Sequence, residues 1–314
     1  MSAPHQLETA PPVSLTPEPI VRLRHPMKWV FTIVVGLLAV LIVISLFTND
    51  RYQWDVVLNY FFSDQILRGL VTTLWLTVVA MIVGIVIGVV VAIMKLSSNR
   101  TLQTVATVYI WFFRGTPVFV QLLFWGYISA LYPVISIGVP FGDQFFSVPT
   151  NVVITPLVAA ILGLGLNEGA YMAEIVRTGI MAVHRGQIEA AQALGMKQGR
   201  ILRRIVLPQA MRVIIPPTAN ETINMLKTTS LVSVLAFPEL LYSAQLIYAQ
   251  NFQTIPLLIT ASIWYLLVTS VLTVGQFYLE RYYGRGTSSP VGGARTRTPV
   301  FTRRRPSTGG HDHD

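Results

Sequence analysis

Two polar residues, Asn167 and Glu168, stand inside one of the long apolar stretches of the chain, flanked by glycines. An ionisable group in such a stretch is costly to bury and marks a candidate functional site. Beside small residues and facing a cavity, the Glu168 carboxylate could hold an α-ammonium group or a basic side chain. Tyr171, three residues further on, belongs to the same candidate pathway. A helix–helix salt bridge, or a protonated and hydrogen-bonded carboxyl group, would also explain Glu168.

A second group of polar residues recurs at helical spacing in the next apolar stretch. Positions 220, 224 and 227 share one face of a helix, and positions 221, 224 and 228 share a similar one. Such a stripe must face protein or water rather than lipid. It indicates a translocation pathway at a subunit interface, with interhelical hydrogen bonding as the alternative. We also expect Pro216 and Pro217 to set the start of the membrane-embedded helix. The polar residues are Asn220, Glu221, Asn224, Lys227 and Thr228.

The composition identifies the class of protein that must position these residues. The chain has 314 residues, of which 53% are hydrophobic and only 12% are charged. Soluble domains carry roughly 25% charged residues, and apolar runs near the length of one bilayer crossing recur along this chain. The sequence therefore predicts an all-α integral membrane protein.

The net charge of +9 does not indicate a nucleic-acid partner. The Lys and Arg residues lie in short segments between apolar runs and in the tails, where cytoplasmic orientation explains them. The absence of cysteine excludes a thiol nucleophile and a thiolate metal site. We expect no metal site in this chain and no nucleic-acid binding.

About six transmembrane helices are expected, between two tails that we predict to be disordered. The first tail is residues 1–28, and the second is a disordered basic tail over residues 284–314. An extra N-terminal transmembrane helix is expected over residues 29–47, retained rather than cleaved. The transmembrane domain covers residues 66–280. The expected spans are about Trp29–Phe47, Leu70–Met94, Phe113–Leu131, Val152–Val176, Ile214–Phe237 and Pro256–Leu279.

The distribution of Lys and Arg predicts the topology. Most of these residues fall in alternate loops, whereas the opposite loops offer only Arg51 and Arg68. This bias places both termini in the cytoplasm, and the segment from Arg177 to Leu207 becomes the longest cytoplasmic loop between spans. Gly84 and Gly88 lie at GxxxG spacing, so another helix could pack closely against that face.

The longest cytoplasmic loop carries a spaced motif. Glu189-Ala190-Ala191 is followed after three residues by Gly195, and after nine more by Ile205, one further residue and Leu207-Pro208. This segment resembles the EAA loop of ABC importer permeases, EAA-x3-G-x9-I-x-LP, at every defined position.

The composition of this loop suits docking. Residues 187–194 favour a helix that Gly195 can end with a left-handed cap, and Glu189 complements the helix dipole near its start. A second short basic helix is expected over residues 198–207, ending before Pro208. An interfacial helix without a partner is the alternative.

Further segments resemble the polar amino-acid permeases in particular. Residues 113–122 read FRGTPVFVQL, which matches the F-R-G-T-P-x-x-V-Q-L segment of that family, and residues 170–177 match its A-Y-x-A-E-I-x-R segment. Lys227 begins a segment similar to K-[DN]-T-S-L, except that Thr228 replaces the usual Asp or Asn. The motif residues without an assigned role are Arg114, Gly115, Thr116, Pro117 and Gln121.

The resemblance implies the membrane subunit of a type I ABC importer, with a five-helix core to which the first span is extra. Two permease subunits, identical or homologous, would combine with cytoplasmic ABC ATPase subunits and an extracytoplasmic solute-binding protein. The substrate would be a polar or charged amino acid, and the location the bacterial inner membrane, in contact with lipid. ATP and Mg²⁺ would bind the ATPase, so this chain would be no enzyme and need no cofactor. The family's docking residues correspond to Glu189, Ala190, Ala191, Gly195, Leu207 and Pro208.

Two other classes of protein fit the sequence less well. An enzyme finds no support, because the chain has no G-x-x-x-x-G-K-[ST] loop, no H-E-x-x-H helix and no G-x-S-x-G elbow. A secondary transporter could use intramembrane Glu and Lys for proton coupling, but such carriers often show inverted repeats, and none is convincing here. A secondary carrier also has no need of an EAA-type loop.

Overall fold

The computed structural model describes residues 26–138 and 144–283. It divides into two units, Met1–Trp54 and Asp55–Asp314. Residues 1–25 and 284–314, which hold nearly all of the two predicted tails, lie outside the described residues.

The first unit contains one long apolar helix, α1 (Pro26–Thr48), followed by a short 3-10 turn, η1 (Asp50–Tyr52). The helix covers the predicted first span, and its side chains are almost all exposed within the unit. At its end, Trp54 Nε1 donates a hydrogen bond to the Leu46 carbonyl at 2.8 Å, and the Trp54 ring stacks on Phe47. Exposure of so many apolar side chains fits a helix surrounded by lipid.

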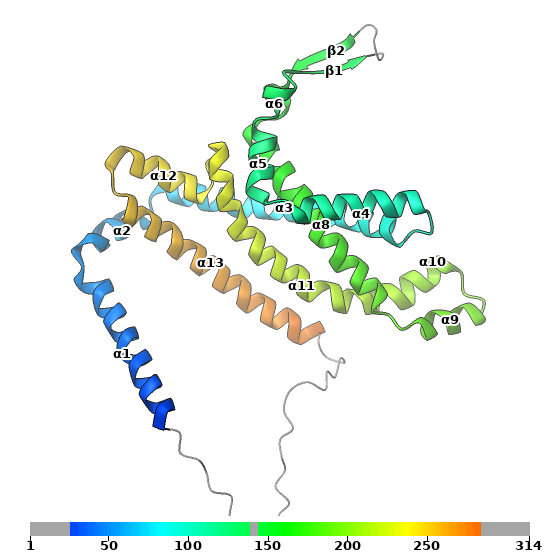
Figure 1. Ribbon diagram of the computed structural model, residues 1–314, viewed down its shortest axis with the longest axis horizontal. Helices are drawn as coiled ribbons and strands as arrows, with labels where there is room; N and C mark the ends of the chain where they lie inside the picture. Colours follow the sequence, from blue (N-terminus) through cyan, green and yellow to red (C-terminus); the bar gives the residue numbers. More distant parts are fainter. Residues whose placement is uncertain (1–25, 139–143, 284–314) are drawn as a thin grey trace, which may run out of the picture. The chain divides into compact units, whose positions relative to one another are not determined.

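The second unit is helical apart from one β-hairpin (Figure 1). Of the described helices in the whole chain, four are long and apolar enough to cross a membrane, and six spans result if each of two bent helix pairs counts as one. The elements up to the hairpin are α2 (Trp54–Phe61), α3 (Asp64–Leu96), α4 (Arg100–Gly115), α5 (Val118–Gly126), α6 (Ile128–Leu131), β1 (Val134–Gly138) and β2 (Gln144–Pro149). They continue with α7 (Thr150–Val153), α8 (Pro156–Met181), α9 (Arg185–Ala193), α10 (Gln198–Ile201), η2 (Leu202–Val206), α11 (Leu207–Thr228), η3 (Thr229–Leu235), α12 (Leu240–Asn251) and α13 (Thr254–Tyr283).

Helices α3 and α8 pack in parallel through glycines on both partners. A Cβ atom at Gly84 would come within 2.5 Å of Glu168 Cγ, and one at Gly88 within 2.4 Å of Met172 Cβ. In the other direction, Gly165 and Gly169 of α8 receive side chains of α3. The predicted close-packing face at Gly84 and Gly88 is therefore present.

The predicted third span, Phe113–Leu131, is wrong as a single straight helix. Helix α4 ends at Gly115 and α5 begins at Val118, and the two are bent by 99°. Pro117 has no N–H to continue the helix, and Thr116 before it is extended, as proline favours. A hydropathy pattern alone does not reveal such a bend.

The helix that contains α11 is longer than predicted. It runs without a break from Gln198 to Leu235 and includes a π-helical turn, η2, directly before Pro208. The expectations that a helix ends before Pro208 and that Pro216 and Pro217 start the span are therefore wrong. Prolines are tolerated inside membrane helices because neighbouring helices and local π-type adjustments satisfy the freed backbone groups.

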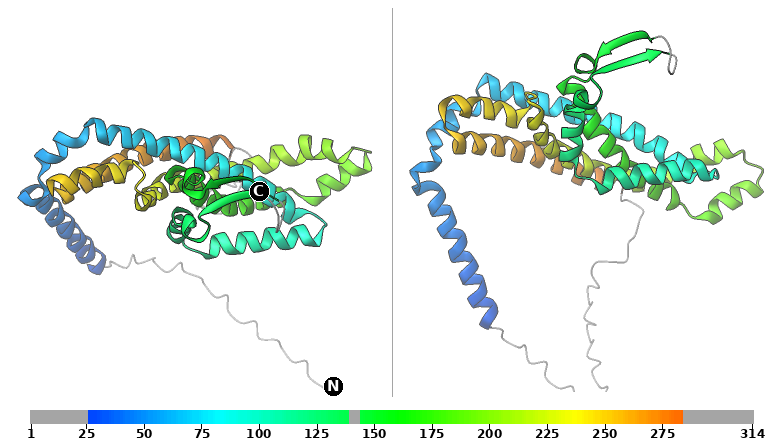
Figure 2. Two further views of the ribbon diagram at one scale, coloured as in Figure 1. Left: turned by 90° about the horizontal axis from the view of Figure 1, so that it is seen from above. Right: turned by 45° about the horizontal axis from the view of Figure 1, so that its top comes forward.

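Different helices form the two ends of the helical unit. Helices α9 and α10 lie at one end, and α2 and α12 lie at the other (Figure 2). The hairpin of β1 and β2 is antiparallel, pairs Val134 with Pro149, and projects away from the helices (Figure 1). Since α8 leads directly towards α9, the hairpin before α8 lies at the end opposite α9.

Candidate functional site

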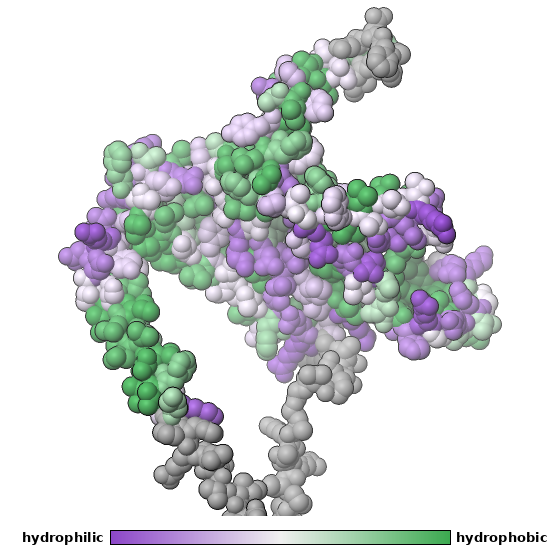
Figure 3. Space-filling view, viewed as in Figure 1, coloured by the Kyte–Doolittle hydropathy of each residue, from purple (hydrophilic) through white to green (hydrophobic). Residues whose placement is uncertain are grey.

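A cavity of about 290 Å³ lies between α5, α8 and α11. It brings together three of the polar residues predicted from the α8 sequence and three of those from α11. Hydrophilic residues gather between α4, α5 and α11 in the middle of the face shown in Figure 3. The cavity is lined by Val118, Leu164, Asn167, Glu168, Tyr171, Glu221, Asn224, Met225 and Thr228.

Glu168 is the buried carboxyl group of this cavity. It is only 4% exposed, and among the described residues its Oε1 atom has no hydrogen-bond partner. Glu168 also forms no ion pair within that part of the chain, so the helix–helix salt bridge considered from the sequence is absent there. A buried carboxylate oxygen without a partner is unfavourable, and a cation entering the cavity would supply the missing interaction.

Asn167 lines the cavity, but its side chain is hydrogen-bonded to residues that do not line it. Its Nδ2 atom donates to the Phe113 carbonyl at 2.8 Å and to Gln121 Oε1 at 3.3 Å. Gln121 in turn donates to the Phe113 carbonyl at 3.1 Å and to Thr116 Oγ1 at 2.7 Å. The two amides therefore satisfy carbonyl groups that the bend at Pro117 leaves without a helical partner. This accounts for Thr116, Pro117 and Gln121, whose motif had no assigned role.

Arg114 is placed against α8 by the same bend. Its guanidinium carbon lies 5.0 Å from the centroid of the Tyr171 ring, which is a cation–π geometry. Gly115, directly before the bend, has no heavy atom within 4 Å of where a Cβ would stand. The Arg114 side chain therefore lies against the Tyr171 face of α8, at the end of α4.

A second cavity, of about 310 Å³, lies on the α9 side of the first. Tyr171 and Glu221 line both, so the two cavities meet at these side chains. Together they follow the boundary between α8 and α11, which run antiparallel. The second cavity is lined by Arg114, Tyr171, Glu174, Ile175, Thr178, Val213, Pro217 and Glu221.

Of the two faces considered for α11, the structure places one in the cavities. Glu221, Asn224 and Thr228 line them, whereas Asn220 and Lys227 are exposed and line neither. Helical spacing alone could not choose between the faces, because both contain position 224. The predicted pair of Glu174 and Arg177 is confirmed, with Arg177 Nη2 2.6 Å from Glu174 Oε2.

The loop between α8 and α11 forms the predicted helix, α9. Gly195 adopts φ +74°, so the predicted left-handed end is confirmed. Ala191 is buried against the α10–η2 segment, whereas Glu189 and Ala190 are exposed and Leu194 is 82% exposed. Gln209 Nε2 at the start of α11 donates to Gln187 Oε1 at 2.6 Å, which ties α9 to the long helix. Leu207 and Pro208 are exposed at the same point.

The sequence reasoning missed a second buried carboxylate, Glu239. It is fully buried and caps α12 by accepting from the backbone N–H groups of Leu241 at 2.9 Å and Tyr242 at 2.6 Å. Tyr265 OH also donates to it at 2.9 Å. The residue follows Pro238 after an apolar run, where a cap could have been sought. All of these contacts indicate a structural role.

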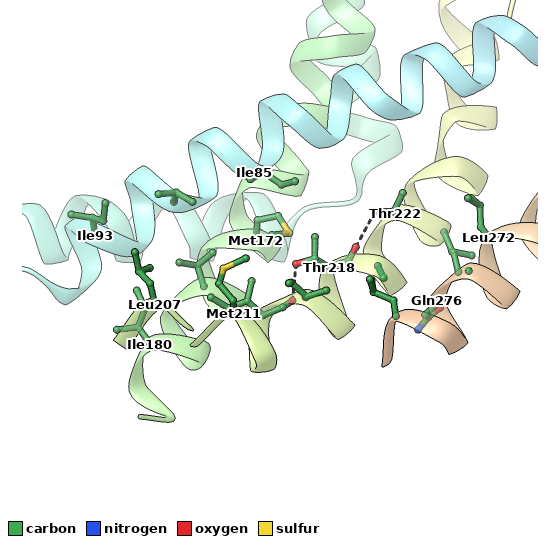
Figure 4. A pocket seen from close by; sticks show the side chains of 18 of the residues that line it. Ile85, Ile93, Met172, Ile180, Leu207, Met211, Thr218, Thr222, Leu272 and Gln276 are labelled. Carbon is green, nitrogen blue, oxygen red and sulfur yellow. Dashed lines mark hydrogen bonds between the residues drawn. The ribbon is translucent and has the colours of Figure 1, made fainter. Parts of the chain in front are cut away.

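Another cavity is different in kind. It is an apolar groove of about 790 Å³ between α3, α8, α11 and α13 (Figure 4). Two of the hydroxyls on its wall donate within their own helix, Thr218 to the Ile214 carbonyl at 2.8 Å and Thr222 to the Thr218 carbonyl at 3.0 Å. The groove has no charged lining residue, so it suits hydrocarbon and not an amino acid.

Comparison with known proteins identifies the chain. Residues 84–284 match the family described as binding-protein-dependent transport system inner membrane component. The chain is 44% identical, over 89% of its length and 86% of the relative, to the arginine transport system permease protein ArgU of Corynebacterium glutamicum. It is 35% identical, over 77% of its length and 95% of the relative, to the L-cystine transport system permease protein TcyB of Bacillus subtilis.

A solved structure of an amino acid ABC transporter with histidines is also similar. It is 34% identical and has a TM-score of 0.59, with coverage of 69% of this chain and 94% of that one. These similarities confirm the resemblance drawn from the EAA loop and the FRGTP segment. They also confirm a transport subunit rather than an enzyme. The chain belongs to the binding-protein-dependent transport system inner membrane components, as a multi-pass inner-membrane permease subunit of an amino-acid ABC importer.

Proposed function

We propose that this permease conducts a cationic amino acid and that the cavity at Glu168 binds its positively charged group. The observation that carries the proposal is the buried Glu168 oxygen without a partner among the described residues. The charged residues lining that cavity are Glu168 and Glu221, both acidic. Two carboxylates favour a substrate with a side-chain cation over a neutral or acidic amino acid.

The relatives support the same class of substrate. ArgU, which matches over most of both chains, is named as an arginine permease. TcyB, named for cystine, is less similar. Arginine carries two cationic groups and one carboxylate, so it suits a pathway with more acidic than basic groups.

The partner ATPase is proposed to dock on α9. Glu189, Ala190 and Leu194 are exposed there, while Ala191 anchors the helix to the rest of the unit. Gly195 permits the sharp turn at the end of α9, and Leu207 and Pro208 lie exposed where the long helix continues. ATP and Mg²⁺ would bind the ATPase, so this chain would need no cofactor.

The remaining partners follow from the ends of the helical unit. We assign the α9 end, and with it both termini, to the cytoplasm, because Lys and Arg concentrate in the loops at that end. The solute-binding protein would then meet the opposite end. A second permease subunit would cover the flank of α11 that carries Asn220 and Lys227, since exposed polar groups in a membrane helix require protein or water. Lipid would surround the apolar faces.

The proposal is tested by uptake of radiolabelled arginine into liposomes that contain the complete transporter with its binding protein. Glu168→Gln removes the charge and keeps the shape. Asp64→Asn is the matched control, since Asp64 is exposed and pairs only with Arg68 among the described residues. We expect at least about a tenfold loss of uptake for Glu168→Gln, because hydrogen bonds to charged groups contribute roughly 1.5–3 kcal/mol.

The assembled complex must be recovered in equal amount for each variant, measured by size-exclusion chromatography. Arginine uptake that stays near the wild-type rate in Glu168→Gln would refute the proposed cation site. Uptake of a neutral amino acid in preference to arginine by the wild-type transporter would refute the substrate class.

A further inference from the structure

We infer that Arg114 binds the α-carboxylate of the transported amino acid in the second cavity, beside Tyr171. This inference rests on the proposed function and assigns the opposite end of the same substrate. Arg114 belongs to a motif whose other polar members build the α4–α5 bend, whereas the guanidinium takes no part in that hydrogen-bonding network.

The guanidinium of Arg114 is held without being neutralised. Its Cζ atom stands over the Tyr171 ring, 5.0 Å from the ring centroid. Within the described ranges, no hydrogen bond or ion pair uses this side chain. The nearest acidic residue on its cavity wall along α8, Glu174, already binds Arg177 through both Nε and Nη2 at 2.9 and 2.6 Å. Arg114 therefore offers an unused fork of donors, which is the geometry that binds a carboxylate.

The charges along the two cavities match a basic amino acid. Glu168 lies in the first cavity, Glu221 lies where the cavities meet, and Arg114 lies in the second. Glu168 and Tyr171 are three residues apart on one helix face, a rise of about 4.5 Å, and Arg114 stands over Tyr171. A substrate lying along this line would place its cations towards the two carboxylates and its carboxylate towards the guanidinium.

If Arg114 binds the carboxylate, the permease should bind a free amino acid more tightly than the corresponding amine. A ligand with the same cations but no carboxylate would leave Arg114 unpaired. Its net positive charge would also be higher by one, which is unfavourable beside the guanidinium. Agmatine is such a ligand, because it is arginine without its carboxylate. The ratio of the two affinities therefore reports on Arg114 itself.

The experiment is isothermal titration calorimetry on the permease–ATPase complex purified from membranes, without the binding protein. L-Arginine and agmatine are titrated into the wild type, Arg114→Gln, Arg114→Lys and the control Arg100→Gln, which changes an exposed residue at the start of α4. We expect the wild type and the control to prefer arginine by about tenfold or more. In Arg114→Gln this preference should fall to within about twofold through loss of arginine affinity. Arg114→Lys, which keeps the charge but not the fork, should lie between.

The outcomes separate the two proposals. A wild-type complex that binds arginine, combined with an unchanged arginine-to-agmatine ratio in Arg114→Gln, would overturn the role of Arg114 alone. If the wild-type complex bound neither ligand, the cation site at Glu168 would fall as well. A merely structural role for Arg114 would weaken both ligands together and leave their ratio unchanged, so it also counts against the inference.

Discussion

Gln121 on α5 and Asn167 on α8 both donate a hydrogen bond to the same backbone oxygen, the carbonyl of Phe113 on α4, at 3.1 and 2.8 Å. Three helices therefore meet at one acceptor. The acceptor is freed by the bend at Pro117, so the residues that break the helix also position the wall of the cavity at Glu168.

Replacing Gln121 by leucine should loosen this junction. The Thr116 and Phe113 acceptors would lose a buried donor, and Asn167 would lose a partner, so we expect a destabilisation of about 1–3 kcal/mol. Thermal unfolding of the purified complex would measure it. Gln103→Leu is the control, because Gln103 is exposed and its side chain bonds only the Ser97 carbonyl among the described residues. An equal effect of both changes would contradict the junction.

Gly84→Ala should destabilise the α3–α8 pair. The added methyl group would lie 2.5 Å from Glu168 Cγ and 2.7 Å from its Cβ, and overpacking of this kind costs roughly 1–3 kcal/mol. Gly275→Ala adds the same group where no heavy atom lies within 4 Å. It should leave stability unchanged or raise it by up to about 1 kcal/mol through helix propensity. Melting temperatures of the two variants should therefore move apart.

Glu239→Gln should weaken the start of α12. The variant keeps one acceptor oxygen, so it cannot bind the Leu241 and Tyr242 N–H groups and the Tyr265 hydroxyl as the carboxylate does. We expect a loss of about 1–3 kcal/mol in the free energy of unfolding. Glu280→Gln, at an exposed site on α13, should change it by less than about 0.5 kcal/mol. Urea unfolding in detergent would compare them, and equal midpoints would exclude the capping role.

Leu194→Asp should break ATPase docking without harming the fold. Leu194 is 82% exposed at the end of α9, so a surface change there should alter stability by less than about 0.5 kcal/mol. Affinity purification followed by mass spectrometry should show the ATPase with the wild type and a strongly reduced amount with the variant. Thr101→Asp, at another exposed position on the same end of the unit, should retain the ATPase. Retention by Leu194→Asp would move the docking surface elsewhere.

The helix α9 and its end at Gly195 could be predicted from the sequence because their signals are local. The spacing from Glu189 to Gly195 fits one short helix and one left-handed end, and neither depends on distant contacts. The apolar spans were found for the same reason, since length and hydropathy are properties of each segment alone. Their boundaries moved by several residues, because caps and packing decide them.

The features that the sequence did not predict depend on tertiary contacts. The bend at Pro117 is stabilised by Gln121 and Asn167, and Asn167 lies 46 residues away from Gln121 in the chain. The choice of Glu221 over Asn220 as a cavity residue depends on which side of α11 meets α8. Periodicity shows which residues share one face of a helix, but it does not show which other helix packs against that face.

The reciprocal glycines of α3 and α8 have a consequence for motion. Because Gly84 and Gly88 receive α8 side chains while Gly165 and Gly169 receive those of α3, neither helix can slide or turn against the other without a clash. We expect the two helices to move together as one rigid pair during transport. We therefore expect a change of access to occur on the other side of α8, along its boundary with α11, where the two cavities lie.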